Sequence, residues 1–74
     1  MKIQDLIKAE KQFGELMQKE EYKEALIYSL ENKGALNRMI HKDLSGILSK
    51  FSEKGISREE LGDWLYSLFD NNPY

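Results

Sequence analysis

The sequence predicts an all-α fold, a compact three- or four-helix bundle in which short loops join antiparallel neighbours. Three observations predict it. Val and Thr are absent while Leu, Lys, Glu, Ala and Met are abundant, which favours helix over strand. The only proline is Pro73, so nothing breaks a helix before the tail. Apolar residues also recur at helical spacing along most of the chain. With 74 residues, one core and one domain over 1–74 are expected.

Two helices are predicted in the first half of the chain. The first covers about 3–19, with an apolar stripe of Ile3, Leu6, Ile7, Phe13 and Met17. The second covers 22–31, with Tyr22, Ala25, Leu26, Ser29 and Leu30 on one face. Asn32-Lys33-Gly34 is predicted to end it, because glycine tolerates the left-handed conformation that follows many helices. The alternative is a helix that continues through Gly34 with a kink.

Two more helices are predicted in the second half. The clearest stripe predicts a single helix over about 35–54, and it contains Leu36, Met39, Ile40, Leu44, Ile47, Leu48 and Phe51. Lys54-Gly55 ends this helix with a basic last turn and a glycine cap. Ser57-Arg58-Glu59-Glu60 is a capping box, in which the Ser57 hydroxyl accepts the Glu60 amide and the Glu60 side chain reaches back. It starts a helix over about 57–70, with Leu61, Trp64, Leu65 and Leu68 facing inward.

The composition argues against several classes of protein. There is no cysteine and one histidine, so disulfides, thiol catalysis and a histidine-rich metal site are not expected. The charged first twenty residues do not fit a signal peptide, and no apolar run reaches membrane-spanning length. Neither a phosphate-binding glycine loop nor a catalytic motif is present. We therefore expect a cytoplasmic protein that is not an enzyme and needs no cofactor and no metal.

Three polar residues lie close to the apolar stripes. Glu10 falls inside the stripe of the first helix, where its carboxylate is expected to reach water; the alternative is an ion pair with Arg38 or His41. His41 and Asp43 lie about 160° apart on a helical wheel, so within one helix they cannot form a catalytic pair. His41 is interpreted as a residue at the rim of the core.

The outer face of the last helix is the candidate binding site. Glu59, Asp63, Tyr66 and Asp70 fall within about 60° of one another, opposite the apolar face. Tyrosine is a common interface anchor, and carboxylates speed the encounter with a basic partner. The alternative is an ordinary solvated helix face. Tyr28 also projects away from the stripe of its helix, where the bundle either covers it or leaves it to a partner.

One segment resembles a known family. Ser45-Gly46-Ile47-Leu48-Ser49-Lys50-Phe51 and then Gly55-Ile56-Ser57-Arg58-Glu59-Glu60-Leu61-Gly62-Asp63-Trp64-Leu65 resemble part of the small helical immunity proteins. These proteins accompany bacterial toxins of the colicin D and contact-dependent inhibition type. The resemblance implies a helical bundle that blocks the active site of a toxin nuclease, with acidic groups in place of nucleic-acid phosphate. Carried onto this chain, it implies that Glu59, Asp63, Tyr66 and Asp70 contact the toxin.

Two other classes of function remain open. A small regulatory or adaptor bundle, which can self-associate, fits the composition. A helix-turn-helix that binds nucleic acid can be drawn over 44–69, but its second helix begins with Glu59, Glu60 and Asp63, which would repel phosphates. We therefore expect another protein with a basic surface as the partner, and no membrane.

Overall fold

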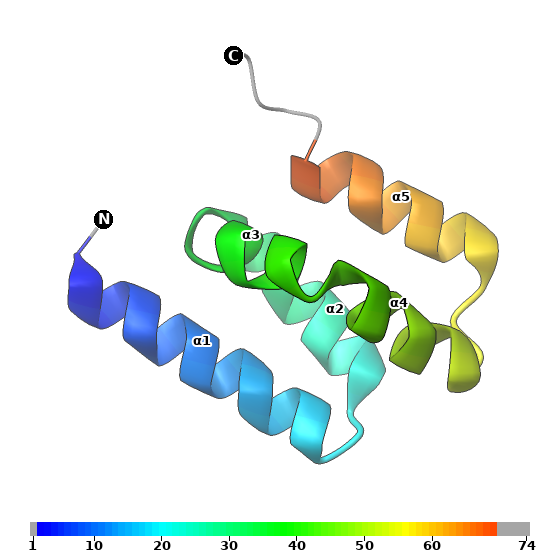
Figure 1. The fold of residues 1–74 in the computed structure, drawn as a ribbon, viewed down its shortest axis with the longest axis horizontal. Coiled ribbons are helices and arrows are strands. Elements are labelled where there is room, and N and C mark those ends of the chain that lie inside the picture. Colours follow the sequence, from blue (N-terminus) through cyan, green and yellow to red (C-terminus); the bar gives the residue numbers. More distant parts are fainter. Residues whose placement is uncertain (1, 70–74) are drawn as a thin grey trace.

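The computed structural model describes residues 2–69, and these form five α-helices without a β-strand (Figure 1). The helices are α1 (Ile3–Gln18), α2 (Tyr22–Glu31), α3 (Lys33–Lys42), α4 (Leu44–Glu53) and α5 (Arg58–Phe69). The predicted all-α class is confirmed. The predicted number of three or four helices is wrong, because the expected helix over 35–54 is divided into α3 and α4.

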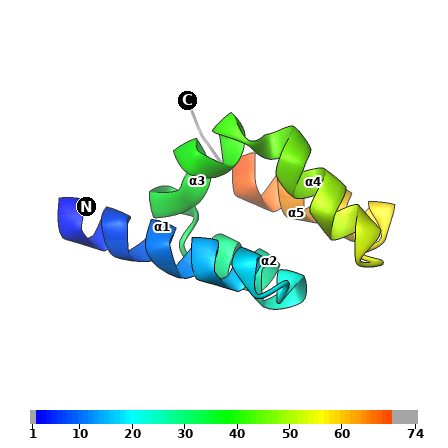
Figure 2. The same ribbon diagram turned by 60° about the horizontal axis from the view of Figure 1, so that its bottom comes forward.

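The helices run back and forth across a flat molecule with extents of 34 × 31 × 18 Å. α1 and α2 form an antiparallel hairpin, and α3 and α4 together make a bent third pass (Figure 1). α5 returns beside α4 and packs on α2, α3 and α4. Figure 2 shows α1 and α2 side by side, with α3 and α4 rising over them. α1 packs only on α2 and α3 among the described helices, and so forms one edge of the molecule.

Single Asx residues make the two shortest connections. Asn32 separates α2 from α3 at φ −125° and ψ 35°, and Asp43 separates α3 from α4 at φ −120° and ψ 32°. Asn and Asp are weak helix formers because their side chains compete for backbone hydrogen bonds. The Asn32 side chain, for example, donates a hydrogen bond from its Nδ2 to the Tyr28 backbone carbonyl at 3.0 Å. The second helix ends at Glu31, as predicted, but Asn32 ends it rather than a left-handed Gly34, because Gly34 lies in the first turn of α3.

A change of neighbours explains the break at Asp43. α3 and α4 both pack on α2 and α5, but only α3 also packs on α1, so the third pass must change direction to follow the core. Asp43 supplies a residue that leaves the helical conformation readily, and Gly46 makes room for its carboxylate. A Cβ at Gly46 would lie 2.8 Å from Asp43 Oδ1.

The predicted glycine cap of α4 is confirmed and forms a Schellman motif. Gly55 has φ +89°, its amide donates to the Ser52 carbonyl at 3.1 Å, and the Ile56 amide donates to the Phe51 carbonyl at 3.1 Å. Both Phe51 and Ile56 are buried, so the apolar contact that usually accompanies this motif is present.

α1 ends with the same motif, but without a glycine. The Glu21 amide donates to the Leu16 carbonyl at 2.9 Å and the Glu20 amide to the Met17 carbonyl at 3.1 Å. Glu20 therefore occupies the left-handed position, with φ 61°. A residue with a Cβ is strained there, and glycine is the usual choice.

The apolar faces predicted over residues 22–70 do face the core, in α2, α3, α4 and α5. Their buried residues are Ala25, Leu26 and Ser29 of α2, Ala35, Leu36 and Ile40 of α3, Ile47 and Phe51 of α4, and Leu61, Trp64 and Leu68 of α5. At the centre, the Phe51 and Trp64 rings meet edge to face with centroids 5.2 Å apart, and Tyr22 lies 5.9 Å from Phe51. These three rings join α2, α4 and α5.

The stripe predicted for the first helix is only partly buried. Phe13 is 1% exposed, but Ile3 is 73% exposed and Ile7 58% exposed. Their predicted place in the core is wrong, because neither neighbour of α1 reaches over that side of its first two turns. Glu10 is half-buried and makes no ion pair with Arg38 or His41.

Candidate functional site

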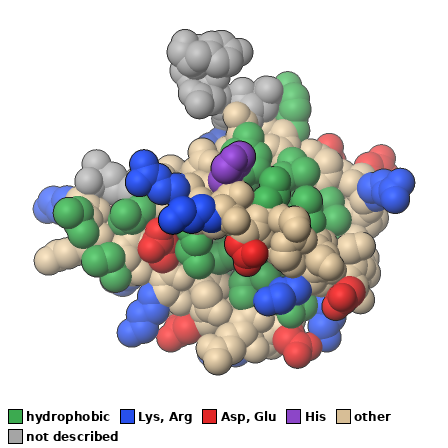
Figure 3. Space-filling model, viewed as in Figure 1, with side chains coloured by type: hydrophobic (Ala, Val, Ile, Leu, Met, Phe, Trp, Pro, Cys, Tyr) green, Lys and Arg blue, Asp and Glu red, His purple; other side chains and the backbone are tan. Residues whose placement is uncertain are grey.

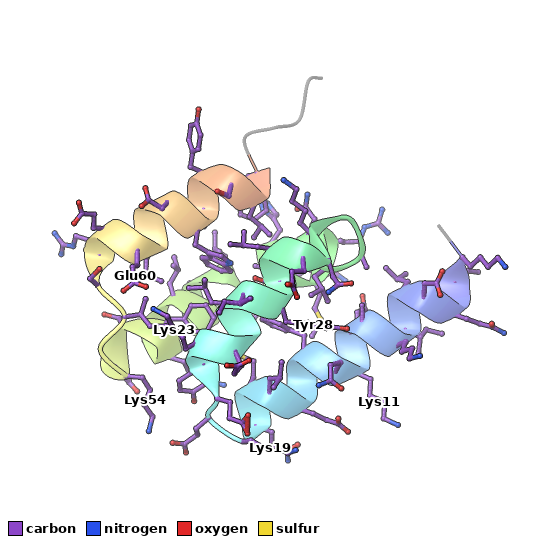
Figure 4. All side chains as sticks on the ribbon, turned by 180° about the vertical axis from the view of Figure 1, so that it is seen from behind. Lys11, Lys19, Lys23, Tyr28, Lys54 and Glu60 are labelled. Atoms are coloured by element: carbon purple, nitrogen blue, oxygen red, sulfur yellow. The ribbon has the colours of Figure 1, made fainter. Side chains whose placement is uncertain are left out.

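The capping interaction that starts α5 is half of the predicted one. The Glu60 amide donates to Ser57 Oγ at 3.1 Å, as predicted. The Glu60 carboxylate does not reach back to Ser57. It accepts from Lys23 Nζ of α2 at 2.5 Å, and this ion pair is partly exposed (Figure 4). Glu60 therefore links the start of α5 to α2, although an exposed pair of this kind contributes little to stability.

Buried contacts on the inner face of α5 fix how the helix is rotated on the core. Trp64 is 1% exposed, and its Nε1–H donates to Ser29 Oγ of α2 at 2.7 Å. The Ser29 hydroxyl in turn donates to the Leu26 carbonyl at 2.6 Å. At the far end of α5, Lys33 Nζ donates to the Ser67 carbonyl at 3.1 Å. With its inner face fixed, α5 presents a defined outer face to solvent.

Three of the predicted binding residues lie on that outer face. Glu59, Asp63 and Tyr66 are all exposed, and the Tyr66 side chain is the most exposed aromatic of the described residues, at 69%. Neither carboxylate joins an ion pair in residues 2–69, whereas neighbouring Glu60 is neutralised by Lys23. We call Glu59, Asp63 and Tyr66 the α5 outer face. Its negative charge is available to a partner, and an exposed ring lies beside it.

The remaining two predicted binding residues are not part of this surface. Asp70 lies outside the described residues. Tyr28 is half-buried against the core, in a shallow hollow between α1, α2 and α3 whose lining includes Asp5, Lys8 and Asn32 (Figure 4). The bundle therefore covers most of Tyr28, which is one of the two alternatives that the sequence left open. The structure does not bring Tyr28 to the α5 outer face.

A second ion pair joins the ends of α1 and α4. Lys54 Nζ lies 2.7 Å from Glu20 Oε1. The hydrogen bond and the charge of Lys54 lower the pKa of Glu20, and the same contact raises the pKa of Lys54. Both groups are exposed, so the pair contributes little to stability. Sequence reasoning missed it, as it missed the pair of Lys23 with Glu60, because each pair joins residues far apart in the chain.

An apolar groove lies on the other side of α5, against α4. Leu48, Leu61 and Leu65 line it, together with Arg58 and several serines. Figure 3 shows hydrophobic side chains gathered over these helices. His41, which was predicted at the rim of the core, is exposed and meets the half-buried Phe69 ring edge-on at 5.6 Å between centroids.

The structure offers little for other site types. Within 2–69, no group of three or more histidine or acidic side chains could hold a metal ion. No helix in the part of the chain that is described has both the length and the apolar character to span a membrane. No protein-family model matches the chain, and no similar curated protein or solved structure was found.

Proposed function

We propose that this chain is a non-enzymatic protein-binding module whose α5 outer face docks on a basic protein surface. One observation carries the proposal: Tyr66 is 69% exposed beside two carboxylates that make no ion pair within residues 2–69. Tyrosine loses little conformational entropy on binding and supplies apolar area and a hydroxyl in one side chain. Glu59 and Asp63 would accelerate encounter with a positive surface.

The resemblance of residues 45–65 to immunity proteins suggests the class of partner. A toxin nuclease has a basic active site that binds phosphates, and an acidic helix face is complementary to it. The proposal is therefore a small inhibitor that covers such a site. The first turn of α5 supports a protein partner over nucleic acid, because Glu59 there is exposed, makes no ion pair within residues 2–69 and would repel phosphates.

A capture experiment with matched variants tests this function. Immobilised wild-type protein, Asp63→Lys and Glu53→Lys are exposed to a lysate of the native host at low salt, and the captured proteins are identified by mass spectrometry. Glu53 is an exposed acid on α4, away from the α5 outer face, so its variant changes the net charge equally. We expect a basic partner that wild type and Glu53→Lys retain and Asp63→Lys loses. A captured set that is the same for all three proteins would contradict the proposal.

A further inference from the structure

The apolar groove between α4 and α5 borders the α5 outer face directly. At 100° per residue, Leu65 in the groove is followed around α5 by Gly62, and then by Tyr66 and Glu59, all within about 120°. Gly62 lines the groove and is itself exposed, so it forms the lip that the two surfaces share. The groove and the α5 outer face are therefore one continuous surface, apolar on one side of Gly62 and acidic on the other.

The groove has the dimensions of a short helix–helix contact. α4 and α5 run beside each other along it (Figure 1), and its lining on α4 extends from Ser45 to Ser52, about 11 Å along the helix axis. Three leucines form its apolar floor, and Figure 3 shows hydrophobic side chains gathered there. The lips carry small residues, serines on α4 and Gly62 on α5. Small lips allow another helix to approach closely, so the groove accommodates about two turns of a third helix.

Nothing in the folding of this chain requires a glycine at position 62. Gly62 lies inside α5, and its φ is not in the left-handed region that favours glycine. A Cβ at this position would meet nothing within 4 Å. Glycine also lowers helix stability relative to alanine, so its presence here weakens α5 without any gain in packing. The open backbone at the shared lip is instead suited to the close approach of a partner.

The charges around the groove indicate the chemistry of its occupant. On the α5 side, Glu59 and Asp63 are exposed and make no ion pair within residues 2–69, whereas the α4 lip consists of neutral serines. Arg58 lines the end of the groove where α5 begins, and it too makes no ion pair among the described residues. A complementary helix has an apolar stripe, basic residues on the flank that faces α5, and its partially negative C-terminal end at Arg58.

We propose that the groove binds an amphipathic helix of the partner, with its apolar stripe over the three leucines and its lysine or arginine side chains against Glu59 and Asp63. This inference rests on the proposed function, because it specifies how the same partner is held. The groove supplies the apolar contact area that the α5 outer face, with its single tyrosine, lacks. The acidic residues and Tyr66 then lie at the rim of the contact, where charge steers the approach of the partner.

Two synthetic peptides test the groove. The probe is a helix-forming peptide of about 18 residues, or five turns, with a leucine stripe flanked on one side by lysines. The control peptide has the same composition, with its leucines distributed all around the helix. NMR titration of the amide resonances at physiological salt measures binding and locates it. We expect the striped peptide to shift resonances of Leu48 and Leu65 as well as Glu59 and Asp63, and to bind roughly tenfold or more tightly than the control peptide.

Substitutions at the two lips provide matched variants. Gly62→Gln should weaken binding of the striped peptide roughly tenfold or more, because a long side chain at the lip keeps a helix out of the groove. The same change should leave the Tm unchanged or raise it, since open space surrounds Gly62 and glutamine is the better helix former. Ser49→Gln obstructs the opposite lip and should also weaken binding. Gly14→Gln is the control, because Gly14 has open space on α1, which does not pack on α4 or α5 within residues 2–69.

Several results would overturn this proposal. It is wrong if neither peptide binds or both bind equally, if the shifts stay confined to the α5 outer face, or if Gly62→Gln binds like wild type. It is also wrong if a second copy of the chain fills the groove, which sedimentation equilibrium would show as a mass above 8.7 kDa that Gly62→Gln abolishes.

The partner captured from the host separates this proposal from the proposed function. We expect Asp63→Lys and Gly62→Gln both to lose it. A partner that Asp63→Lys loses but Gly62→Gln retains would leave the proposed function standing and refute the role of the groove. A partner that both variants retain would refute the proposed function and, with it, this inference.

Discussion

Replacement of Ser29 by alanine removes one oxygen atom from the centre of the fold. That oxygen accepts the Trp64 Nε1–H at 2.7 Å, while its own proton is donated to the Leu26 carbonyl at 2.6 Å. Ser29 is 0% exposed and Trp64 is 1% exposed, so solvent does not reach the indole N–H to replace the lost acceptor. In Ser29→Ala, the Trp64 donor is left buried and without a partner.

The expected loss follows from that orphaned donor. A buried polar group without a partner costs about 1–3 kcal/mol. Alanine is the better helix former by about 0.5 kcal/mol, which offsets part of the loss. We expect Ser29→Ala to lower the free energy of unfolding by about 1–2 kcal/mol. That is a large share of the roughly 4–11 kcal/mol expected for 74 residues, and it corresponds to a Tm lowered by roughly 4–16 °C.

Urea and thermal unfolding followed by circular dichroism measure this loss. Ser49→Ala, at an exposed serine of α4, is the control and should raise the free energy of unfolding by up to about 0.5 kcal/mol through helix propensity alone. In a Trp64→Phe background the indole N–H is absent, so Ser29→Ala should there cost much less than in wild type. The reasoning is refuted if Ser29→Ala matches the Ser49→Ala control, or if its cost is the same in both backgrounds.

Three further predictions concern stability. Glu20→Gly should raise the Tm, because glycine relieves the left-handed conformation at φ 61°, whereas Glu20→Gln should lower it slightly; equal Tm values in thermal melts would contradict this. Lys54→Met removes the ion pair with Glu20. The stabilisation by this pair should be fully present between pH 4.5 and pH 10.5, the ordinary pKa values of Glu20 and Lys54. It should be lost as the pH falls through the lowered carboxyl pKa or rises through the raised amine pKa, and it should shrink in high salt, as unfolding measured across pH would show. Gly62→Ala should stabilise α5 by up to about 1 kcal/mol, since open space surrounds it, but Gly46→Ala should gain less because its Cβ meets the Asp43 carboxylate. Equal gains in urea unfolding would contradict the contact at Gly46.

Local patterns were enough to predict the helical class and most of the buried faces. An inward stripe follows from spacing alone, which is why Leu36, Ile40, Ile47 and Phe51 were correctly placed in the core. The break at Asp43 could not be predicted in the same way, because the apolar stripe continues across it. The break depends on α3 and α4 having different neighbours, and spacing within one segment does not contain that information.

The exposure of Ile3 and Ile7 on α1 could not be predicted for the same reason, because it too depends on which helices become neighbours. Ile3 and Ile7 belong to an apolar stripe, and only the finished packing reveals that no neighbouring helix covers them. For the candidate site, the helical wheel was sufficient to place Glu59, Asp63 and Tyr66 on one exposed face. It could not show that Glu60, one residue away, pairs with Lys23 of α2, because 37 positions of sequence separate the two residues. That the α5 outer face binds a partner stays a prediction.

The most direct test of that prediction is the binding kinetics of a captured partner at low and at physiological salt. Wild type, Asp63→Lys, Tyr66→Ala and the control Glu53→Lys are compared by surface plasmon resonance. We expect Asp63→Lys to slow association, most strongly at low salt, and Tyr66→Ala to speed dissociation, with Glu53→Lys close to wild type. Association and dissociation rates that are unchanged in Asp63→Lys and Tyr66→Ala would show that the α5 outer face is ordinary solvated surface.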